Sequence, residues 1–215
     1  GYLQADKLIV STAVSMSELG AFLLAVQVSG VVLLVGASVQ QVVQPKLIKS
    51  LQTGDIRSVA TLYVLACFLG PLCAWCAYMV FALFGDALFF FITGEYQEFE
   101  VAKIASMLAL GAGAVNVMAV VFAIQNSVGV LRFHWLGSSL FIVVQLCAAM
   151  YILRDQSVWD FVFYSQVLNI VYILFFGSIV SVRFIRGYNL WTVGAIVCGA
   201  VGSLSLLHVS KFGWG

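Results

Sequence analysis

The sequence predicts an all-α protein, a polytopic bundle of about seven transmembrane helices. Hydrophobic residues form 63% of its 215 residues and charged residues only 9%, whereas about 25% of a soluble domain is charged. Uncharged runs long enough to cross a hydrocarbon core of about 30 Å, which takes roughly 20 helical residues, recur along the whole chain. Strands are excluded because an open sheet leaves its backbone unpaired in lipid, and a spanning barrel shows shorter, alternating segments.

Seven apolar segments are candidates for the helices. Their approximate bounds are residues 1–17, 19–44, 57–84, 101–124, 130–152, 158–182 and 189–210. Pro45 is expected to end the second helix, because proline lacks the backbone N–H that a helix needs, and Gly54-Asp55 is expected to turn the chain toward the third. Residues 87–93 are also apolar, and they either extend the third helix or lie at the membrane interface.

Cationic residues gather in alternate connections between these segments. The connections after the second, fourth and sixth segments hold Lys46, Lys49, Arg57, Arg132, Arg183 and Arg186. The other connections are mainly acidic, and we assign to them Glu18, Asp86, Glu95, Glu98, Glu100, Arg154, Asp155 and Asp160. Lys and Arg are enriched in cytoplasmic loops, so we predict that the first set anchors the cytoplasmic side.

Several functional classes are disfavoured. The net charge of +1 gives no basic field for nucleic acid. Cys73 and Cys76 form a CxxC, but no second pair or nearby histidine completes a zinc site, so packing is the expected role. No HExxH, GxSxG or DDxxD-like pattern occurs, and the two histidines, His134 and His208, are far apart. We expect no enzyme activity, no metal and no cofactor.

Asp6 and Lys7 are the clearest charges inside an apolar segment. An ionised group near the bilayer centre costs about 2.5 to 3.5 kcal/mol on insertion scales, so such residues usually serve a function. Successive helical residues point about 100° apart, so these two need not pair with each other. The competing interpretation is a solvated, frayed start of the chain.

The second segment carries polar and small residues on one side. Projected at 3.6 residues per turn, five of them fall within about 80° of one another: Gly20, Gln27, Gly30, Ser38 and Gln41. Gln44 lies near the edge of this set. An amide within a lipid-spanning helix either bonds a neighbouring helix or faces water.

Two further sets of residues are ambiguous between helix packing and cavity lining. In the fourth segment the set is Ala102, Ser106, Ala109, Gly113 and Asn116, and in the sixth it is Ser165, Asn169 and Tyr172. Small residues at this spacing favour close packing for the fourth segment. Gln125 and Asn126, near Arg132, are expected in an ordinary solvated loop rather than at an anionic headgroup.

A family resemblance rests on motifs in the first 125 residues or so. The order of ADKLIVS, SELGAFLLAVQV, QPKLIKSL with a following GD, and FITGEYQEFEVAKIASMLALG resembles the C-terminal half of the polysaccharide (O-antigen) flippases. These belong to the multidrug/oligosaccharidyl-lipid/polysaccharide exporter superfamily. Beyond that point the resemblance depends only on helix count and loop charge.

The resemblance implies an architecture of two six-helix lobes. Residues 1–182 would be the C-terminal lobe, and residues 183–215 an additional helix and tail. The chain would be a fragment whose N-terminal lobe is missing, and alone it would translocate nothing. The expected location is the bacterial cytoplasmic membrane.

The implied function is flipping of undecaprenyl-diphosphate-linked oligosaccharide across that membrane by alternating access. The expected partners are the bilayer, the lipid-linked oligosaccharide and the missing lobe, with a proton or sodium gradient as the energy source. Lys7 would meet the diphosphate and Asp6 the coupling ion. The other pathway candidates are Gln27, Gln41, Gln44, Asn116 and Asn169.

Three alternatives remain open at the level of sequence. A multidrug/cation antiporter of the same superfamily would have an acidic, aromatic-lined cavity. A membrane-embedded enzyme of glycolipid or polysaccharide assembly would need a large external loop or an interfacial cluster of His, Asp or Arg. A membrane scaffold without transport activity conflicts with no sequence feature.

Overall fold

The computed structural model describes residues 10–12, 14–94, 101–127, 129, 131–155, 158–184 and 189–212. Within these residues the chain is helical and contains no strand, which confirms the all-α prediction. Residues 10–12 are helical, and the rest of the first predicted segment lies largely outside the described residues. The six long helices are α2 (Met16–Gln52), α3 (Ile56–Thr93), α4 (Val101–Ser127), α5 (Leu131–Asp155), α6 (Val158–Phe184) and α7 (Asn189–Phe212).

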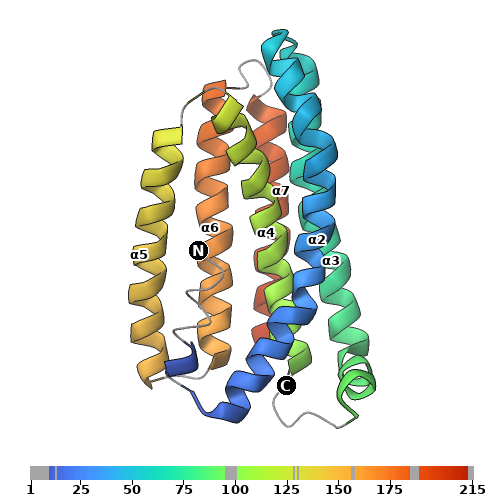
Figure 1. Ribbon diagram of the computed structural model, residues 1–215, viewed down its shortest axis with the longest axis vertical. Coiled ribbons are helices and arrows are strands. Elements are labelled where there is room, and N and C mark those ends of the chain that lie inside the picture. Colours follow the sequence, from blue (N-terminus) through green and yellow to red (C-terminus); the bar gives the residue numbers. More distant parts are fainter. Residues whose placement is uncertain are drawn as a thin grey trace.

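All six long helices are long and apolar enough to cross a membrane. Successive helices run in opposite directions, as Figure 1 shows. Helix α4 is the centre of the bundle, because it contacts α2, α3, α5, α6 and α7. Helix α5 stands at one edge and, among the six long helices, packs mainly against α6, with a smaller contact to α4. The protein is therefore a multi-pass bundle built around α4.

Helix α2 begins earlier than the sequence predicted. Ser15 caps it: its hydroxyl accepts a hydrogen bond from the Glu18 backbone N–H, and its own N–H donates to the Glu18 carboxylate at 3.0 Å. This reciprocal arrangement satisfies two of the donors that a helix start leaves unpaired. Glu18 therefore belongs to the first turn of α2, and its assignment to a connection was wrong.

Pro45 does not end α2, contrary to our prediction. The helix continues through Pro45 to Gln52. Proline removes one backbone hydrogen bond, but Pro45 is exposed and the helical bonds on both sides persist, so the loss stays local. The predicted turn at Gly54-Asp55 is confirmed: Gly54 has φ +71°, a left-handed conformation that glycine adopts without strain, and Asp55 caps α3.

Helix α3 includes the apolar stretch that follows the third predicted segment. It runs to Thr93 and ends at Gly94, whose φ of +76° forms a left-handed cap. Of the two alternatives for residues 87–93, helix extension is confirmed. Asp86 consequently lies within α3, exposed at its surface, and its assignment to a connection was wrong.

Helices α2 and α3 are longer than one membrane crossing needs. They contain 37 and 38 residues, which corresponds to about 55 Å at 1.5 Å per residue, against a hydrocarbon core of about 30 Å. Their shared connection is the highest point of the bundle in Figure 1. The α2–α3 hairpin therefore projects beyond the neighbouring helices at that end.

Helix α7 packs into the bundle against α3, α6 and α4. The Trp75 indole N–H of α3 donates to Ser203 Oγ of α7 at 3.1 Å. A Cβ at Gly199 would lie 2.9 Å from Pro71 Cγ, so the missing side chain allows α7 to approach α3 closely. Trp75 therefore serves as a packing residue between α3 and α7.

Candidate functional site

The polar residues of α2 lie on the side of that helix that faces away from the bundle. We call this set the α2 outer face: Gly20, Gln27, Gly30, Ser38 and Gln41. Gln27, Ser38 and Gln41 are exposed, and Gln44, at the edge of the set, is half-buried. The buried residues of α2 lie on the opposite side of the helix: Ala21, Phe22, Ala25, Ser29, Val32, Val43 and Leu47.

The α2 outer face also has open space above its two glycines. A Cβ added at Gly20 or Gly30 would meet no atom within 4 Å. Ser38 donates its hydroxyl to the Leu34 carbonyl at 3.0 Å, within the same helix. The glutamine amides at this face project from the bundle, on a helix that is apolar enough to cross a membrane. They can therefore bond to water, a ligand or another protein surface.

Asp6 and Lys7, the two charged pathway candidates, lie outside the described residues. Their interpretation as ligands for a diphosphate and a coupling ion stays a prediction.

Asn116 does not join the α2 outer face. It lies on α4, half-buried, and its amide Nδ2 donates to the Val32 carbonyl of α2 at 3.1 Å. The same amide lies directly over Gly36 of α2, where a Cβ would overlap it. Asn116 therefore joins α2 to α4 through an interhelical hydrogen bond.

The small residues of α4 serve helix packing, as the spacing favoured. Ala102, Ser106, Ala109 and Gly113 are buried. Gly113 faces Ala74 and the carbonyl of Gly70, both on α3. Ala102 faces Gly85, which is also on α3. Small side chains let two helix backbones approach closely, which is how α3 and α4 form their extended contact.

A buried amide cluster connects α5 to α6. It comprises Gln145 of α5 with Ser165, Gln166 and Asn169 of α6, all of them buried. Gln145 Nε2 donates to Ser165 Oγ at 2.8 Å, and Asn169 Nδ2 donates to Gln166 Oε1 at 3.2 Å. The Gln166 amide lies over Gly111 of α4, where a Cβ would collide with it. These hydrogen bonds satisfy amide and hydroxyl groups that would find no hydrogen-bond partner among lipid chains.

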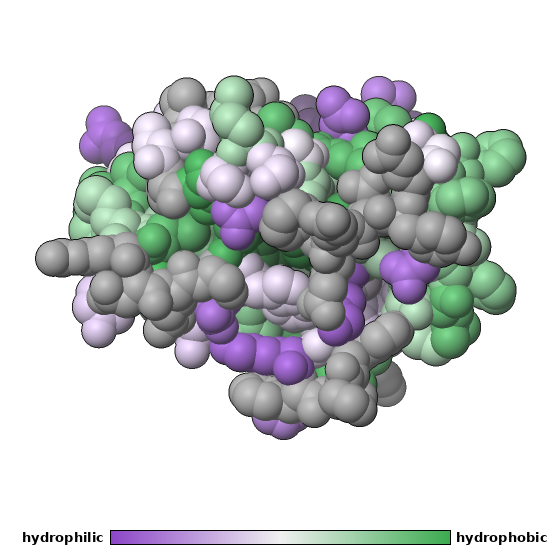
Figure 2. Space-filling model, turned by 90° about the horizontal axis from the view of Figure 1, so that it is seen from below, coloured by the Kyte–Doolittle hydropathy of each residue, from purple (hydrophilic) through white to green (hydrophobic). Residues whose placement is uncertain are grey.

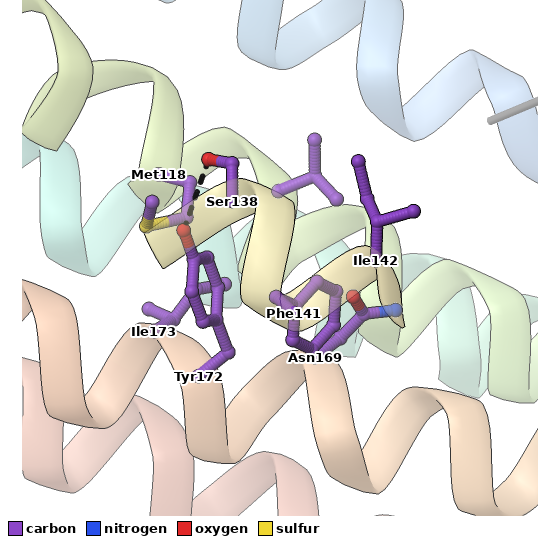
Figure 3. Close-up of a pocket in the computed structure, with 8 residues that line it drawn as sticks. Met118, Ser138, Phe141, Ile142, Asn169, Tyr172 and Ile173 are labelled. Carbon is purple, nitrogen blue, oxygen red and sulfur yellow. Dashed lines mark hydrogen bonds between the residues drawn. The ribbon is translucent and has the colours of Figure 1, made fainter. Parts of the chain in front are cut away.

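A cleft of about 210 Å³ lies between α4, α5 and α6, next to the amide cluster (Figure 3). Asn169 belongs to both features. The Tyr172 and Ser138 hydroxyls share a hydrogen bond of 3.1 Å across the cleft wall. The remaining lining is apolar: Val115, Met118, Phe141, Ile142 and Ile173. The predicted set Ser165, Asn169 and Tyr172 thus divides between helix contact and cleft lining.

Gln125 contradicts the expectation of a solvated loop. It lies within α4 and is buried, while its neighbour Asn126 is exposed. Its Oε1 has no hydrogen-bond partner among the described residues. The prediction failed because α4 continues to Ser127, which keeps Gln125 in the bundle.

Five of the six predicted anchoring cations lie at one end of the bundle. Lys46 and Lys49 lie in the last part of α2, and Arg57 lies in the first turn of α3. Arg132 begins α5 and Arg183 ends α6, both at the same end, shown at the top of Figure 1. All five are exposed. Arg186, the sixth, lies outside the described residues.

Two lysines lie at the opposite end, which Figure 2 views directly. Hydrophilic and hydrophobic residues are both visible at this end. Lys211 of α7 forms an ion pair of 2.9 Å with Asp160 of α6 and lies over the Phe163 ring. Lys103 of α4 lies over the Trp159 ring. Both ammonium groups are therefore held against α6.

Asp55 is the titratable group whose environment is best defined outside the spans. Its carboxylate accepts hydrogen bonds from Ser58, including one of 3.1 Å from the backbone N–H, and these lower the pKa of Asp55, with a smaller contribution from the Arg57 charge. The carboxylate is fully exposed. This is the chemistry of a helix cap rather than of a proton-transfer site.

The structure adds two residues that the sequence interpretation missed. Gln145 and Gln166 do not belong to the sets selected from the sequence, yet both bond within the amide cluster. Their signal was an amide in an otherwise apolar segment, which lipid makes costly without a partner.

Comparisons with family models, with curated proteins and with solved structures find no match to this chain.

Proposed function

We propose that this chain is one lobe of a two-lobed membrane exporter that flips lipid-linked oligosaccharide across the bacterial cytoplasmic membrane by alternating access. In this proposal the α2 outer face forms part of the wall of a polar passage between the lobes. The substrate carries an oligosaccharide on an undecaprenyl-diphosphate, as the family resemblance implies. The lipid tail stays in the bilayer while the glycan crosses.

The exposure of Gln27 and Gln41 is the observation that carries this proposal. Both amides lie on a helix that is apolar enough to span the membrane, yet they point away from the chain's own bundle. Facing acyl chains, each amide would lose its hydrogen bonds, which costs roughly 2 kcal/mol or more. A wet passage shared with a second lobe removes that cost.

The chemistry of the α2 outer face suits a glycan. Glutamine amides donate and accept hydrogen bonds, so they can bind sugar hydroxyls of varied orientation. The open space over Gly20 and Gly30 admits a bulky neutral group beside the backbone. Asp6 and Lys7 would supply the charges that a diphosphate and a coupling ion require.

The proposal orients the cationic end toward the cytoplasm. Lys46, Lys49 and Arg57 lie on the projecting α2–α3 hairpin, and Arg132 and Arg183 lie at the same end. Positive residues close to helix ends are retained on the cytoplasmic side during insertion. At the other end lie Lys103 at the start of α4, Lys211 at the end of α7 and Arg154 at the end of α5. Among the described residues, the end with the α2–α3 hairpin therefore holds more Lys and Arg.

The multidrug/cation antiporter is the second candidate. The aromatic part of the cleft favours it, because Phe141 and Tyr172 stack with ring centroids 4.4 Å apart. Against it, the described residues that line the cleft include no acidic side chain, and an organic cation would need a negative partner at that depth.

Oligosaccharide export tests the proposal directly. It is measured in cells whose export depends on the two-lobed protein that contains this chain. The double variant Gln27→Leu, Gln41→Leu is expected to reduce the rate of oligosaccharide export at least tenfold at an unchanged protein level. The control Val42→Leu, at an exposed apolar position of α2, should leave export unchanged. Unaltered export in the double variant, or extrusion of organic cations without any glycan export, would refute the flippase assignment.

A further inference from the structure

The cleft between α4, α5 and α6 lies near the middle of the membrane-spanning helices. Ser138 and Ile142 are the eighth and twelfth residues of α5, and Asn169 and Ile173 are the twelfth and sixteenth of α6. At 1.5 Å per residue these positions are roughly 10 to 22 Å from the helix ends, which is the depth of the hydrocarbon core. The molecules that can reach the cleft are therefore those of the bilayer interior.

The walls of the cleft are unsuited to water. Its polar groups already bond to protein: Ser138 with Tyr172, and Asn169 with Gln166. A buried water needs two to four polar partners, and the rest of the lining is aliphatic, aromatic or thioether. The cleft has a volume of about 210 Å³ and is partly open. If it were unoccupied, its lining atoms would lack dispersion contacts on that side.

The shape of the cleft follows from how α5 packs. Helix α5 contacts α6 at two levels, through Gly137 against Phe176 and through Gln145 with Ser165. Its contact with α4 is smaller than its contact with α6, and α6 forms the floor of the cleft between α4 and α5. Tyr172 of this floor stacks with Phe141 of α5 and makes a tilted ring contact with Phe176 of α6. The cleft is therefore elongated, partly open and mainly apolar.

We propose that this cleft binds a hydrocarbon chain of a membrane lipid and holds it through delipidation. The chain would lie against Phe141 and Tyr172 between α4 and α5, and would extend the limited contact between these two helices. The proposal does not depend on transport activity, because it concerns retention of lipid by the folded bundle. It assigns the cleft to bilayer lipid rather than to a soluble ligand.

A photo-crosslinking amino acid at Ile142, inside the cleft, tests this proposal. The protein is made in cells, extracted, washed extensively in detergent, irradiated, digested and analysed by mass spectrometry for adducts at residue 142. The expected result is a covalent lipid-chain adduct that survives washing. The same crosslinker at Leu140, which is 67% exposed on the outer side of α5, should lose its lipid adducts during washing.

A filling variant distinguishes occupancy of the cleft from general lipid contact. Val115→Phe places a ring in the cleft and should lower the adduct yield at residue 142 at least fivefold. Val144→Phe, on the exposed side of α5, should leave that yield unchanged. Adducts with water, adducts with peptide from residues 1–17, or loss of lipid at residues 142 and 140 alike would each overturn the proposal.

Discussion

At the scale of single residues, the helix contacts repeatedly place a large side chain over a glycine. Asn116 covers Gly36, Gln166 covers Gly111, Trp75 covers Gly202 and Phe176 covers Gly137. Lipid offers no hydrophobic force between apolar helices, so association depends on such close packing and on interhelical hydrogen bonds. The glycine leaves the space, and the facing amide or ring fills it.

Gly36→Ala is expected to destabilise the bundle, because the new Cβ would overlap the Asn116 amide and disturb its bond to Val32. Overpacking of this kind costs roughly 1 to 3 kcal/mol, measurable as a drop in the free energy of unfolding in detergent. Gly30→Ala, which meets open space on the same helix, is the matched control and should be neutral or slightly stabilising. An equal loss of unfolding free energy in the two variants would show that the contact between Gly36 and Asn116 does not contribute to stability.

The Asp55 cap makes a specific prediction about pH. Its pKa is lowered in the folded state from the ordinary 3.8, so the carboxylate form stabilises folding above that value. The contribution is lost as the pH falls through the lower, folded-state pKa. Thermal unfolding measured between pH 6 and about pH 3 should show an acid-induced loss of stability that is smaller in Asp55→Asn. An identical pH profile in both proteins would contradict this role for the cap.

At the scale of helices, α7 packs against both α6 and α3, and its approach to α3 is close at two glycines. Helices α7 and α3 meet where Gly199 lies beside Pro71 and where Gly202 lies under the Trp75 ring. The hydrogen bond from Trp75 to Ser203 fixes the register of this contact. The ion pair between Lys211 and Asp160 then fastens the last turn of α7 to α6. These contacts make α7 part of the bundle.

Gly202→Ala should separate α7 from α3, because the added methyl group would collide with the Trp75 ring. We expect a loss of roughly 1 to 3 kcal/mol in the free energy of unfolding, together with a shift in tryptophan emission as the indole leaves Ser203. Gly194→Ala on the same helix meets no atom within 4 Å and serves as the control. Unchanged stability and emission in Gly202→Ala would mean that this contact does not position α7.

At the scale of the whole molecule, the alternating directions of the helices bring dispersed cations to one end. Arg57, Arg132 and Arg183 are separated by dozens of residues in sequence, yet they share the end formed by the α2–α3 hairpin. The cationic end and the outward glutamines of α2 are therefore properties of the assembled bundle. Both agree with a lobe that has one cytoplasmic end and one polar side.

Cysteine labelling can test this orientation. In a background with the five native cysteines replaced, Thr53→Cys lies at the cationic end and Ser17→Cys at the other, and both positions are exposed. A membrane-impermeant maleimide added to intact cells should label residue 17 but not residue 53, because positive residues stay inside. Permeabilised cells should show labelling of both. Labelling of residue 53 alone in intact cells would reverse the proposed topology.

The sequence determined the fold class, the approximate spans and the grouping of cations, because hydrophobic length and charge act on each segment locally. It misplaced helix boundaries at Glu18, Pro45 and Asp86, where capping and continued helical bonding outweighed composition. Only the tertiary structure separated the polar residues by role: Gln27 faces outward, while Asn116 bonds α2. Helical periodicity shows which residues share a side of a helix. Whether that side packs against another helix or stays exposed depends on the tertiary structure.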